Sequence, residues 1–517
     1  MKRINYIFVV LALFLMSACS GSLLEIENPN EPTVSTFWKS EDDAQKGINA
    51  AYSMLYKEGT WMRWLSFRYD LGGDEGWSNS PWNELAEWTH FNYVNYNFWE
   101  GNNLHWETFY VGIFRANQVL KYAPEITSFS SPERQKQVIG QAEFLRALWY
   151  FQIVTLWEKG TLNLEPQDGN YIPSDASETQ LWNQIETDLK DAIANLPETW
   201  DAANTGRATV GAAKALLAKA YMQQHKYAEA KTELQWFIDG KGSSLYGLVD
   251  EYVDNFTHYN ENNKEGIFEI QFDDKNKGNT DNNASMATGF QRTQFYAPGG
   301  IGWADGKARA WLIDEYKKEK RVDGKIDTRL LNNVTYKDFP ADFPDSDPKV
   351  YGRDWNWGDD CFIRKYSTNY FRNFEDYFAP NNFRIIRYAD ILLLYAECIA
   401  ETGGSITDAA VYVDKVRQRP STNLAKLADS PFKDCLTSKD KFLKRLQMER
   451  SLELCFEGVR WMDLKRWGLL DNAEGINELK ARDADFNNFV IGKHKRLPIP
   501  QIEVDNSAGA LTQNPNY

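Results

Sequence analysis

The chain has 517 residues, 43% of them hydrophobic and 25% charged, which is the composition of a folded globular protein with one large core or two smaller ones. Its formal net charge of -15, from 58 Lys and Arg against 73 Asp and Glu, repels nucleic acids and other polyanions at long range. We therefore expect no nucleic-acid partner and a ligand that is neutral or cationic.

The first element of the chain is a targeting segment. Two basic residues precede an almost uncharged run over residues 4–16, and Cys19 follows two small residues. The run is shorter than the roughly 20 residues that cross a bilayer as a helix, and its layout is that of a secretory signal. A cysteine in this position resembles the lipobox of bacterial lipoproteins, although Met16 replaces the usual leucine. We predict a lipoprotein signal peptide over residues 1–18 and a lipidated Cys19 with a tether over 19–35; an ordinary signal peptide is the alternative.

A helix is predicted over residues 41–56, and tryptophan is concentrated after it. Seven of the 19 tryptophans lie between residues 61 and 106. An indole that keeps one face open offers a flat π surface on which a sugar ring can pack. Four of the seven are assigned to packing because they fall in predicted helices: Trp61, Trp64, Trp99 and Trp106.

The segment over residues 73–88 reads as an exposed loop, because it combines glycine and proline turns with polar residues. Carboxylate and amide groups beside an aromatic face can hydrogen-bond the hydroxyls of a sugar. Within this loop we predict four ligand contacts: Asp74, Trp77, Trp82 and Asn83.

Further helices follow over residues 131–157 and 180–195. The row from Gly206 has apolar residues on one helix face, with small alanines that allow close helix packing, and KYAEA opens a second helix. A similar pair begins at Arg387, stops at Gly403 and restarts at Ile406. We predict a mostly α fold, a scaffold of tetratricopeptide-like helical hairpins.

A long irregular stretch, at about residues 273–382, interrupts this scaffold and is rich in Asn, Asp, Gly and Pro. Long loops inside a compact protein are usually functional, so we expect this stretch to face a ligand. Its candidate contacts lie in TQFYAPGGIGWADG, before a helix expected at Ala308, and in GRDWNWGDD: Tyr296, Trp303, Arg353 and Trp355. A packing role for each of these aromatic residues remains the alternative.

Three blocks near the C-terminus carry a recognisable pattern: FRIIRYADILLLYAECIAETGG from Phe383, ERSLELCFEGVRWMDLKRWG from Glu449, and RLPIPQIEVDNSAGALTQNPNY at the end of the chain. Together they resemble the signature segments of the SusD/RagB family. The row at Gly206, FIRKYS at Phe362 and the position of Cys19 also match, so the resemblance covers essentially the whole mature chain, with one SusD-like domain expected over residues 36–517.

The resemblance implies a role. Members of this family are extracellular, lipid-anchored proteins of the outer membrane that bind polysaccharide fragments, or in some cases peptides, and deliver them to TonB-dependent transporters of the SusC type. The implied function is capture of an oligosaccharide or polysaccharide, which the net charge suggests is neutral. A peptide-capturing member and a purely structural transporter lid are the alternatives.

We expect no enzymatic activity. The sequence contains none of the H-E-x-x-H, G-x-S-x-G or phosphate-loop motifs. Glu453 and Glu457 could suggest an acid pair, but their interleaving with arginines and apolar residues favours an ion-paired structural helix.

We also expect no cofactor. A structural calcium ion is left open, although the acidic run at Asp345 lacks the glycine and distal glutamate of a dedicated loop. Cys398 and Cys455 are predicted to be core residues, whereas Cys361 and Cys435 are left either free or paired.

Overall fold

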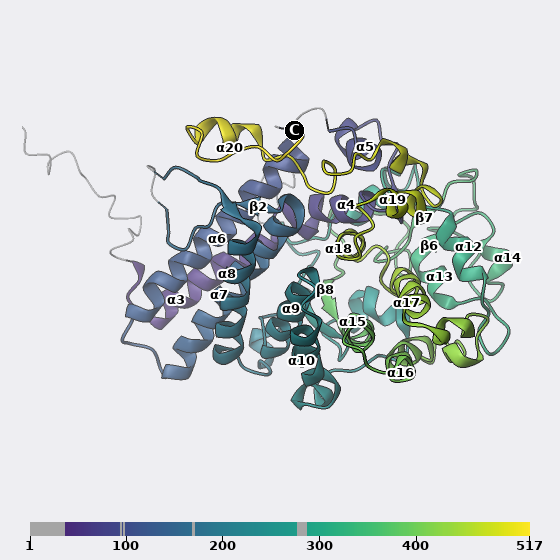
Figure 1. Ribbon diagram of the computed structural model, residues 1–517, viewed down its shortest axis with the longest axis horizontal. Helices are drawn as coiled ribbons and strands as arrows, with labels where there is room; N and C mark the ends of the chain where they lie inside the picture. Colours follow the sequence, from purple (N-terminus) through teal and green to yellow (C-terminus); the bar gives the residue numbers. More distant parts are fainter. Residues whose placement is uncertain (1–36, 94–95, 97–98, 168–170, 277–286) are drawn as a thin grey trace, which may run out of the picture.

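The computed structural model describes residues 37–93, 96, 99–167, 171–276 and 287–517. Figure 1 shows a group of long N-terminal helices at one end, a central helical hairpin, and a second end built from C-terminal helices and short irregular elements. The signal peptide over 1–18, Cys19 and the tether over 19–35 lie outside the described residues. None of the described helices is both long and apolar enough to span a bilayer.

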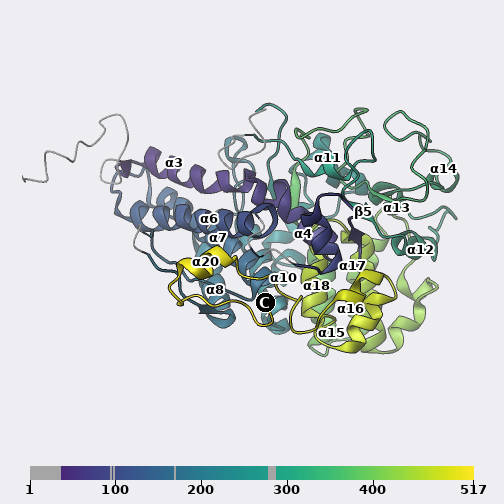
Figure 2. The ribbon, with the colours of Figure 1, turned by 90° about the horizontal axis from the view of Figure 1, so that it is seen from above.

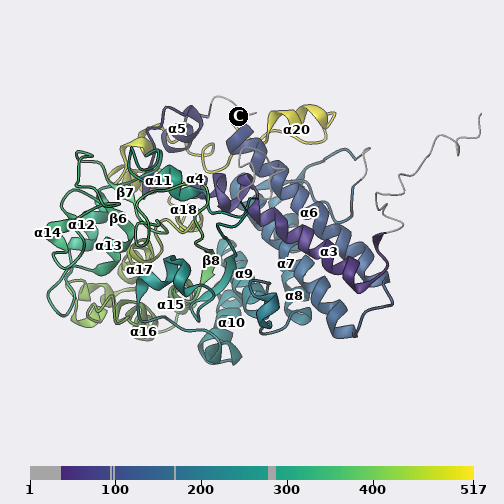
Figure 3. The same ribbon diagram turned by 180° about the vertical axis from the view of Figure 1, so that it is seen from behind.

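The scaffold consists of helices that pack on the next helix in the chain, except that α10 packs on α15 across the irregular stretch. Contacts join α6 to α7, α7 to α8, α8 to α9, α9 to α10, α10 to α15 and α15 to α16. Helix α3 lies across α6 and α7, as Figure 3 shows from behind. The predicted mostly α fold of successive hairpins is thus confirmed. The helices concerned are α3 (Glu41–Tyr52), α6 (Leu104–Tyr122), α7 (Pro132–Trp157), α8 (Glu178–Asn195), α9 (Val210–Gln223), α10 (Tyr227–Ile238), α15 (Tyr388–Glu401) and α16 (Ile406–Arg417).

Local sequence signals set the ends of these helices. The hydroxyls of Ser131 and Thr209 accept hydrogen bonds from backbone amides in the first turns of α7 and α9. Ser177 and Gln180 form a reciprocal capping box at the start of α8. Gly403, with φ of 78°, follows the end of α15, in a conformation that glycine adopts without steric cost.

The irregular stretch is enclosed by a pair of strands. β4 (Gly266–Ile270) and β8 (Phe383–Arg387) form an antiparallel ladder, so the chain leaves and re-enters the scaffold at adjacent positions. Seen from above, the loops between them cover one face of the second end, opposite α15 and α16 (Figure 2). The elements inside the stretch are short: α11 (Arg292–Tyr296), β5 (Lys307–Ala308), α12 (Trp311–Lys317), α13 (Thr328–Asn333), β6 (Val334–Thr335), α14 (Phe339–Asp342) and β7 (Phe362–Ile363). The helix expected at Ala308 begins three residues later.

A small sheet links the tryptophan-rich N-terminal segment to this stretch. Its strand order is β1 (Gly76–Trp77), β5, β7, β6, and Gly76 pairs with Ala308 while Lys307 pairs with Phe362. Two helices flank β1 in the chain, α4 (Trp64–Leu71) and α5 (Asn83–His90). Loops that lie more than 200 residues apart in sequence therefore meet at one surface. The remaining elements are α17 (Lys439–Leu454), α18 (Arg460–Arg466), α19 (Ala473–Lys480), α20 (Gln501–Asn506), β2 (Lys159–Gly160) and β3 (Ala176–Ser177).

A buried ion network holds the C-terminal helices against the strands. Glu453 is fully buried on α17 and lies 2.8 Å from both Arg387 and Arg419 and 3.0 Å from Arg329. Glu457 pairs with Arg387 at 2.6 Å. The predicted ion-paired helix is confirmed, but these partners come from other elements rather than from the next turn of the same helix, which is why the charges can be buried.

The four cysteines among the described residues are free thiols. Cys398 and Cys455 are fully buried in the core, as predicted. Cys361 and Cys435 are unpaired, which resolves the alternative left open by the sequence.

Candidate functional site

An aromatic cluster forms where the tryptophan-rich segment meets the irregular stretch. The buried ring of Phe295 on α11 lies 4.7 Å from Trp303, 5.8 Å from Tyr377 and 6.4 Å from Trp82, measured between ring centroids. Trp303 is 48% exposed, while Trp82 and Tyr377 are partly exposed. These three rings, which we call the aromatic surface, come from three separate loops.

A tight turn fixes Trp303. Its backbone amide donates to the carbonyl of Gln294 at 3.0 Å, and the amide of Ala304 donates to Ala297 at 3.0 Å. Gly302 makes this possible, because a Cβ there would stand 2.3 Å from the Gln294 carbonyl oxygen. The indole is thus positioned by backbone contacts and keeps its outer part in solvent.

A series of hydroxyl hydrogen bonds positions Trp82. The amide of Trp82 donates to the Ser80 hydroxyl at 3.0 Å, and the amide of Ser80 donates to the Ser78 hydroxyl at 3.1 Å. The Ser80 hydroxyl also contacts the carboxyl group of Asp305, whose pKa burial raises above its usual value while this hydrogen bond opposes the rise. The loop of Trp82 is therefore tied to the turn of Trp303.

A buried guanidinium lies beneath the aromatic surface. The Cζ atom of Arg63 stands 5.3 Å from the ring centroid of Phe295 and 4.9 Å from that of Tyr377. Its Nε donates to the side chain of Gln291 at 2.6 Å. Such cation–π contacts hold aromatic rings in a fixed orientation from the protein side.

The loop with Arg353 and Trp355 borders the same turn. Arg353 is exposed and its Nη1 donates to the carbonyl of Gly300 at 2.9 Å, while the indole of Trp357 donates to Gly299 at 2.8 Å. Trp355 is half-buried and its ring centroid lies 5.3 Å from that of Trp357. The structure therefore brings Arg353 and Trp355 beside the turn that carries Trp303.

Two predicted contacts are wrong, because their side chains lie in the core. Asp74 is fully buried and accepts hydrogen bonds from Arg460 at 2.6 and 2.7 Å. Burial alone would raise the pKa of Asp74, but Arg460 and Arg482 outweigh it and lower the pKa. Tyr296 is also buried, and its hydroxyl donates to Asp70 at 3.1 Å. Both residues support the site from within.

Trp77 has a different environment. It is half-buried on β1, and the cationic groups of Lys307 and Arg309 lie 5.0 and 5.2 Å from its ring. Two cations thus already interact with its π system, which leaves it less suited to a sugar than Trp303. Asn83 begins α5, and its side chain lies outside the described part of the structure.

The assignment of helical tryptophans to packing is confirmed for the described side chains. Trp61, Trp64 and Trp106 are buried. The side chain of Trp99 lies outside the described part.

Sequence reasoning missed Tyr377 and a second group of exposed rings. Tyr259, Phe371 and Phe374 are 65%, 40% and 54% exposed. The available signal was the density of aromatic residues in the polar stretch FRNFEDYFAP from Phe371. Because the prediction concentrated on tryptophan, phenylalanine and tyrosine in the same loops received no weight.

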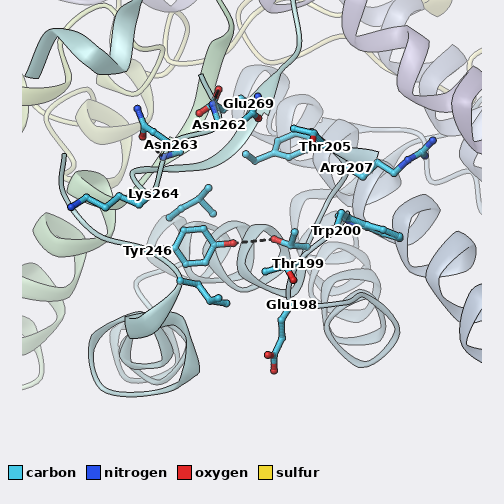
Figure 4. A pocket seen from close by; sticks show the side chains of 16 residues that line it. Glu198, Thr199, Trp200, Thr205, Arg207, Tyr246, Asn262, Asn263, Lys264 and Glu269 are labelled. Atoms are coloured by element: carbon cyan, nitrogen blue, oxygen red, sulfur yellow. Dashed lines mark hydrogen bonds between the residues drawn. The ribbon is translucent and has the colours of Figure 1, made fainter. Parts of the chain in front are cut away.

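Cavities in the described part of the chain lie away from the aromatic surface, and two of them are large. One, of about 460 Å³, is lined by the loop between α8 and α9 and by residues near β4; Trp200 and Tyr246 lie at opposite sides of it (Figure 4). Its polar groups are largely engaged, since Tyr246 contacts the Thr209 hydroxyl at 3.2 Å and the Trp200 indole donates to Ala208 at 2.7 Å. Another, of about 550 Å³, lies between residues 320–331 and 341–346. A ligand that packs on open rings needs no such cavity, so we place the candidate site at the aromatic surface.

Among the residues that the structure describes, no group of three or more His, Cys, Asp or Glu side chains is arranged to hold a metal ion. Asp345, from the acidic run considered for calcium, instead forms an exposed ion pair with Lys325 at 2.8 Å.

Comparison with known families gives two matches that together cover most of the chain. A model described as "SusD family" matches residues 264–517. A model described as "Starch-binding associating with outer membrane" matches residues 24–222.

Individual relatives agree with these matches. SusD-like protein P25 of Formosa agariphila is 26% identical over 530 residues, covering 98% of this chain and 97% of the relative. A SusD superfamily crystal structure from Bacteroides vulgatus is 26% identical with a TM-score of 0.78, covering 93% of this chain and all of that one. A solved laminarin-binding SusD-like protein is 25% identical with a TM-score of 0.74, again over 93% of this chain and all of that one.

Proposed function

The chain belongs to the SusD/RagB family, and from this membership we propose that it captures an oligosaccharide or polysaccharide at the cell surface and delivers it to a SusC-like TonB-dependent transporter. The observation that carries the proposal is the aromatic surface of Trp82, Trp303 and Tyr377, whose rings are fixed around Phe295 while part of their area stays in solvent. The description of a relative of known structure as laminarin-binding supports a carbohydrate ligand.

The polar groups beside these rings fit a sugar. The exposed guanidinium of Arg353 is held by the Gly300 carbonyl and keeps further N–H donors for hydroxyl groups. Stacking on the rings would supply most of the affinity, and these hydrogen bonds would supply orientation. We propose a neutral glycan, since the net charge of -15 repels acidic chains.

We propose a location on the extracellular face of the outer membrane, with the acylated Cys19 as anchor. The family model described as associating with the outer membrane supports this location. Several acyl chains, at about 0.8 kcal/mol per buried methylene, would hold the protein there permanently.

We propose a binding role without catalysis. The carboxylates of Glu453 and Glu457, which the sequence offered as an acid pair, are buried and bound to arginines. They are therefore inaccessible to a polysaccharide.

The test is isothermal titration of the protein truncated after Cys19 against laminarin, amylopectin, xylan, arabinan, polygalacturonate and a mixture of peptides. We expect saturable heat with one neutral glycan, and an affinity at least tenfold weaker, or about 1.4 kcal/mol, in Trp303→Ala and in Trp82→Ala. Val411→Ala is the matched control, because Val411 is equally exposed (48%) but lies on α16.

The other outcomes separate the alternatives. Binding of peptides without any glycan would identify a peptide-capturing member. The absence of binding heat with every ligand would favour a protein that serves only as a structural lid for the transporter.

A further inference from the structure

A second exposed aromatic platform combines a residue that precedes β4 with two residues of the irregular stretch. Tyr259, Phe371 and Phe374 are 65%, 40% and 54% exposed. Tyr259 lies 6.5 Å from Phe371, and both pack against Tyr370 and the imidazole of His258. Among the large hydrophobic side chains exposed in the described chain, all the aromatic ones lie on this platform or are Trp303; the others are aliphatic and lie elsewhere.

Polar contacts hold the platform rigid. The Tyr370 hydroxyl accepts a hydrogen bond from the His258 amide at 3.0 Å and lies 2.6 Å from its Nδ1. The Cζ atom of Arg372 lies 5.6 Å from the ring of Phe371 and 4.7 Å from that of Phe374. Arg372 is itself fixed by the Thr368 hydroxyl at 2.7 Å and by Asp376 at 3.0 Å. Rings fixed in this way lose little entropy when a ligand packs on them.

The platform is continuous with the aromatic surface. Gly352 stands so close to Asn373 that a Cβ on it would lie 3.3 Å from the Asn373 amide nitrogen. The next residue, Arg353, bonds to Gly300 in the loop that carries Trp303. Phe371 and Tyr377 are six residues apart on one segment, which spans at most about 21 Å. A surface path thus leads from Tyr259 through Phe371, Asn373 and Arg353 to Trp303.

We propose that Tyr259, Phe371 and Phe374 form a second subsite that binds the same glycan chain as the aromatic surface, at a position further along the chain. This inference rests on the proposed function. An isolated patch of aromatic and arginine side chains would equally suit a protein partner. Its continuity with the candidate site favours one extended ligand over two unrelated ones.

Two linked subsites predict a dependence on chain length. Once one end of a polysaccharide is bound at Trp303, its next segment meets the second platform at a high effective concentration. A chain too short to reach both platforms gains nothing from the second. The contribution of Tyr259 and Phe371 is therefore expected only with long chains.

The experiment compares a polysaccharide with its own tetrasaccharide. Each polysaccharide of the panel above, its tetrasaccharide and the peptide mixture are titrated into the wild-type protein and three variants. The variants are the double variant Tyr259→Ala/Phe371→Ala, Trp303→Ala, and the control Val411→Ala. We expect the double variant to bind the polysaccharide at least tenfold more weakly while the Trp303-dependent binding of the tetrasaccharide persists. Trp303→Ala should lower the affinity for both the polysaccharide and the tetrasaccharide. Tyr259→Trp, which keeps a stacking surface, should retain the affinity of the wild type for the polysaccharide.

Each contrary result has a distinct meaning. If the wild-type protein binds a polysaccharide and the double variant binds it equally well, the second subsite is refuted and the proposed function stands. If the double variant instead loses peptide binding, the platform belongs to a protein partner. If the wild-type protein binds no glycan, the proposed function fails and the subsite fails with it. Circular dichroism of each variant checks that a loss of binding does not reflect unfolding.

Discussion

The rings of Trp303 and Tyr377 meet edge to face, with centroids 5.6 Å apart and an interplanar angle of 89°. Trp303 meets Phe295 in the same manner, at 4.7 Å and 81°. Edge-to-face contacts fix an indole without stacking another ring on its face. Because Trp303 is also 48% exposed, it combines two properties that a sugar platform needs: a fixed ring and ring area that stays in solvent.

The turn before Trp303 should tolerate alanine at one glycine and not at another. Gly302→Ala would place a Cβ 2.3 Å from the Gln294 carbonyl, whereas a Cβ at Gly299 meets nothing within 4 Å. We expect Gly302→Ala to lower the free energy of unfolding by about 1–3 kcal/mol and to weaken glycan binding, because the turn must shift. Urea denaturation and titration calorimetry measure both effects. Equal behaviour of Gly302→Ala and Gly299→Ala would argue against this positioning of Trp303.

Asp74 should behave as a structural residue. Asp74→Asn removes the carboxylate that lies 2.6 Å from the buried guanidinium of Arg460 and leaves it only the more distant carboxyl group of Glu75, at 3.6 Å, so we expect a loss of about 3–5 kcal/mol in the free energy of unfolding. The protein that remains folded should bind glycan with unchanged affinity. Asp354→Asn is the control, since Asp354 is exposed and its ion pair with Lys349 lies at the surface. Loss of binding at unchanged stability would restore Asp74 as a ligand contact.

The free energy of unfolding should fall at acidic pH as the buried carboxylate of Glu453 becomes protonated. Burial raises its pKa, but Arg419, Arg387 and Arg329 more than offset this and lower the pKa from 4.5 to about 2. Because the pKa in the folded state is the lower one, the stabilisation is complete above pH 4.5 and is lost as the pH falls towards 2. Glu453→Gln should cost about 3–5 kcal/mol at pH 7 and should flatten the decline between pH 5 and pH 2.

The free energy of unfolding of the wild-type protein and of Glu453→Gln is measured by urea denaturation at pH 7, 5 and 3. A wild-type protein whose stability does not change across this range would contradict the assignment. Glu229→Gln, on the outer side of α10, provides an exposed control.

Anchoring to the membrane should depend on the sulfur atom of Cys19. Cys19→Ser replaces the sulfur that would be acylated, so we expect the full-length protein to move from the membrane fraction to the soluble fraction. Labelling with radioactive palmitate followed by fractionation tests this, with Cys361→Ser as the control. A wild-type protein that takes up no palmitate and fractionates in the same way as Cys19→Ser would favour the ordinary signal peptide.

The sequence predicted the scaffold because helices depend on local patterns. Helices α7 and α8 begin within two residues of their predicted starts, and Ser131 and Ser177 cap them there. The C-terminal blocks likewise sufficed to indicate the family. In the site, the sequence correctly placed Trp61, Trp64 and Trp106 in the core, because each falls within a buried part of the helical scaffold.

Which polar and aromatic residues face solvent was decided only by the tertiary structure. Asp74 lies in a segment whose composition predicts an exposed loop. In the structure its carboxylate is buried and accepts a hydrogen bond from Arg460, 386 residues later in the chain. Tyr377 and Trp303 are 74 residues apart and meet only because the irregular stretch folds back between β4 and β8. The sequence by itself determined the helices and the family, since these rest on local periodicity and motifs. The exposure of a side chain depends on partners from distant segments, and this no local pattern encodes.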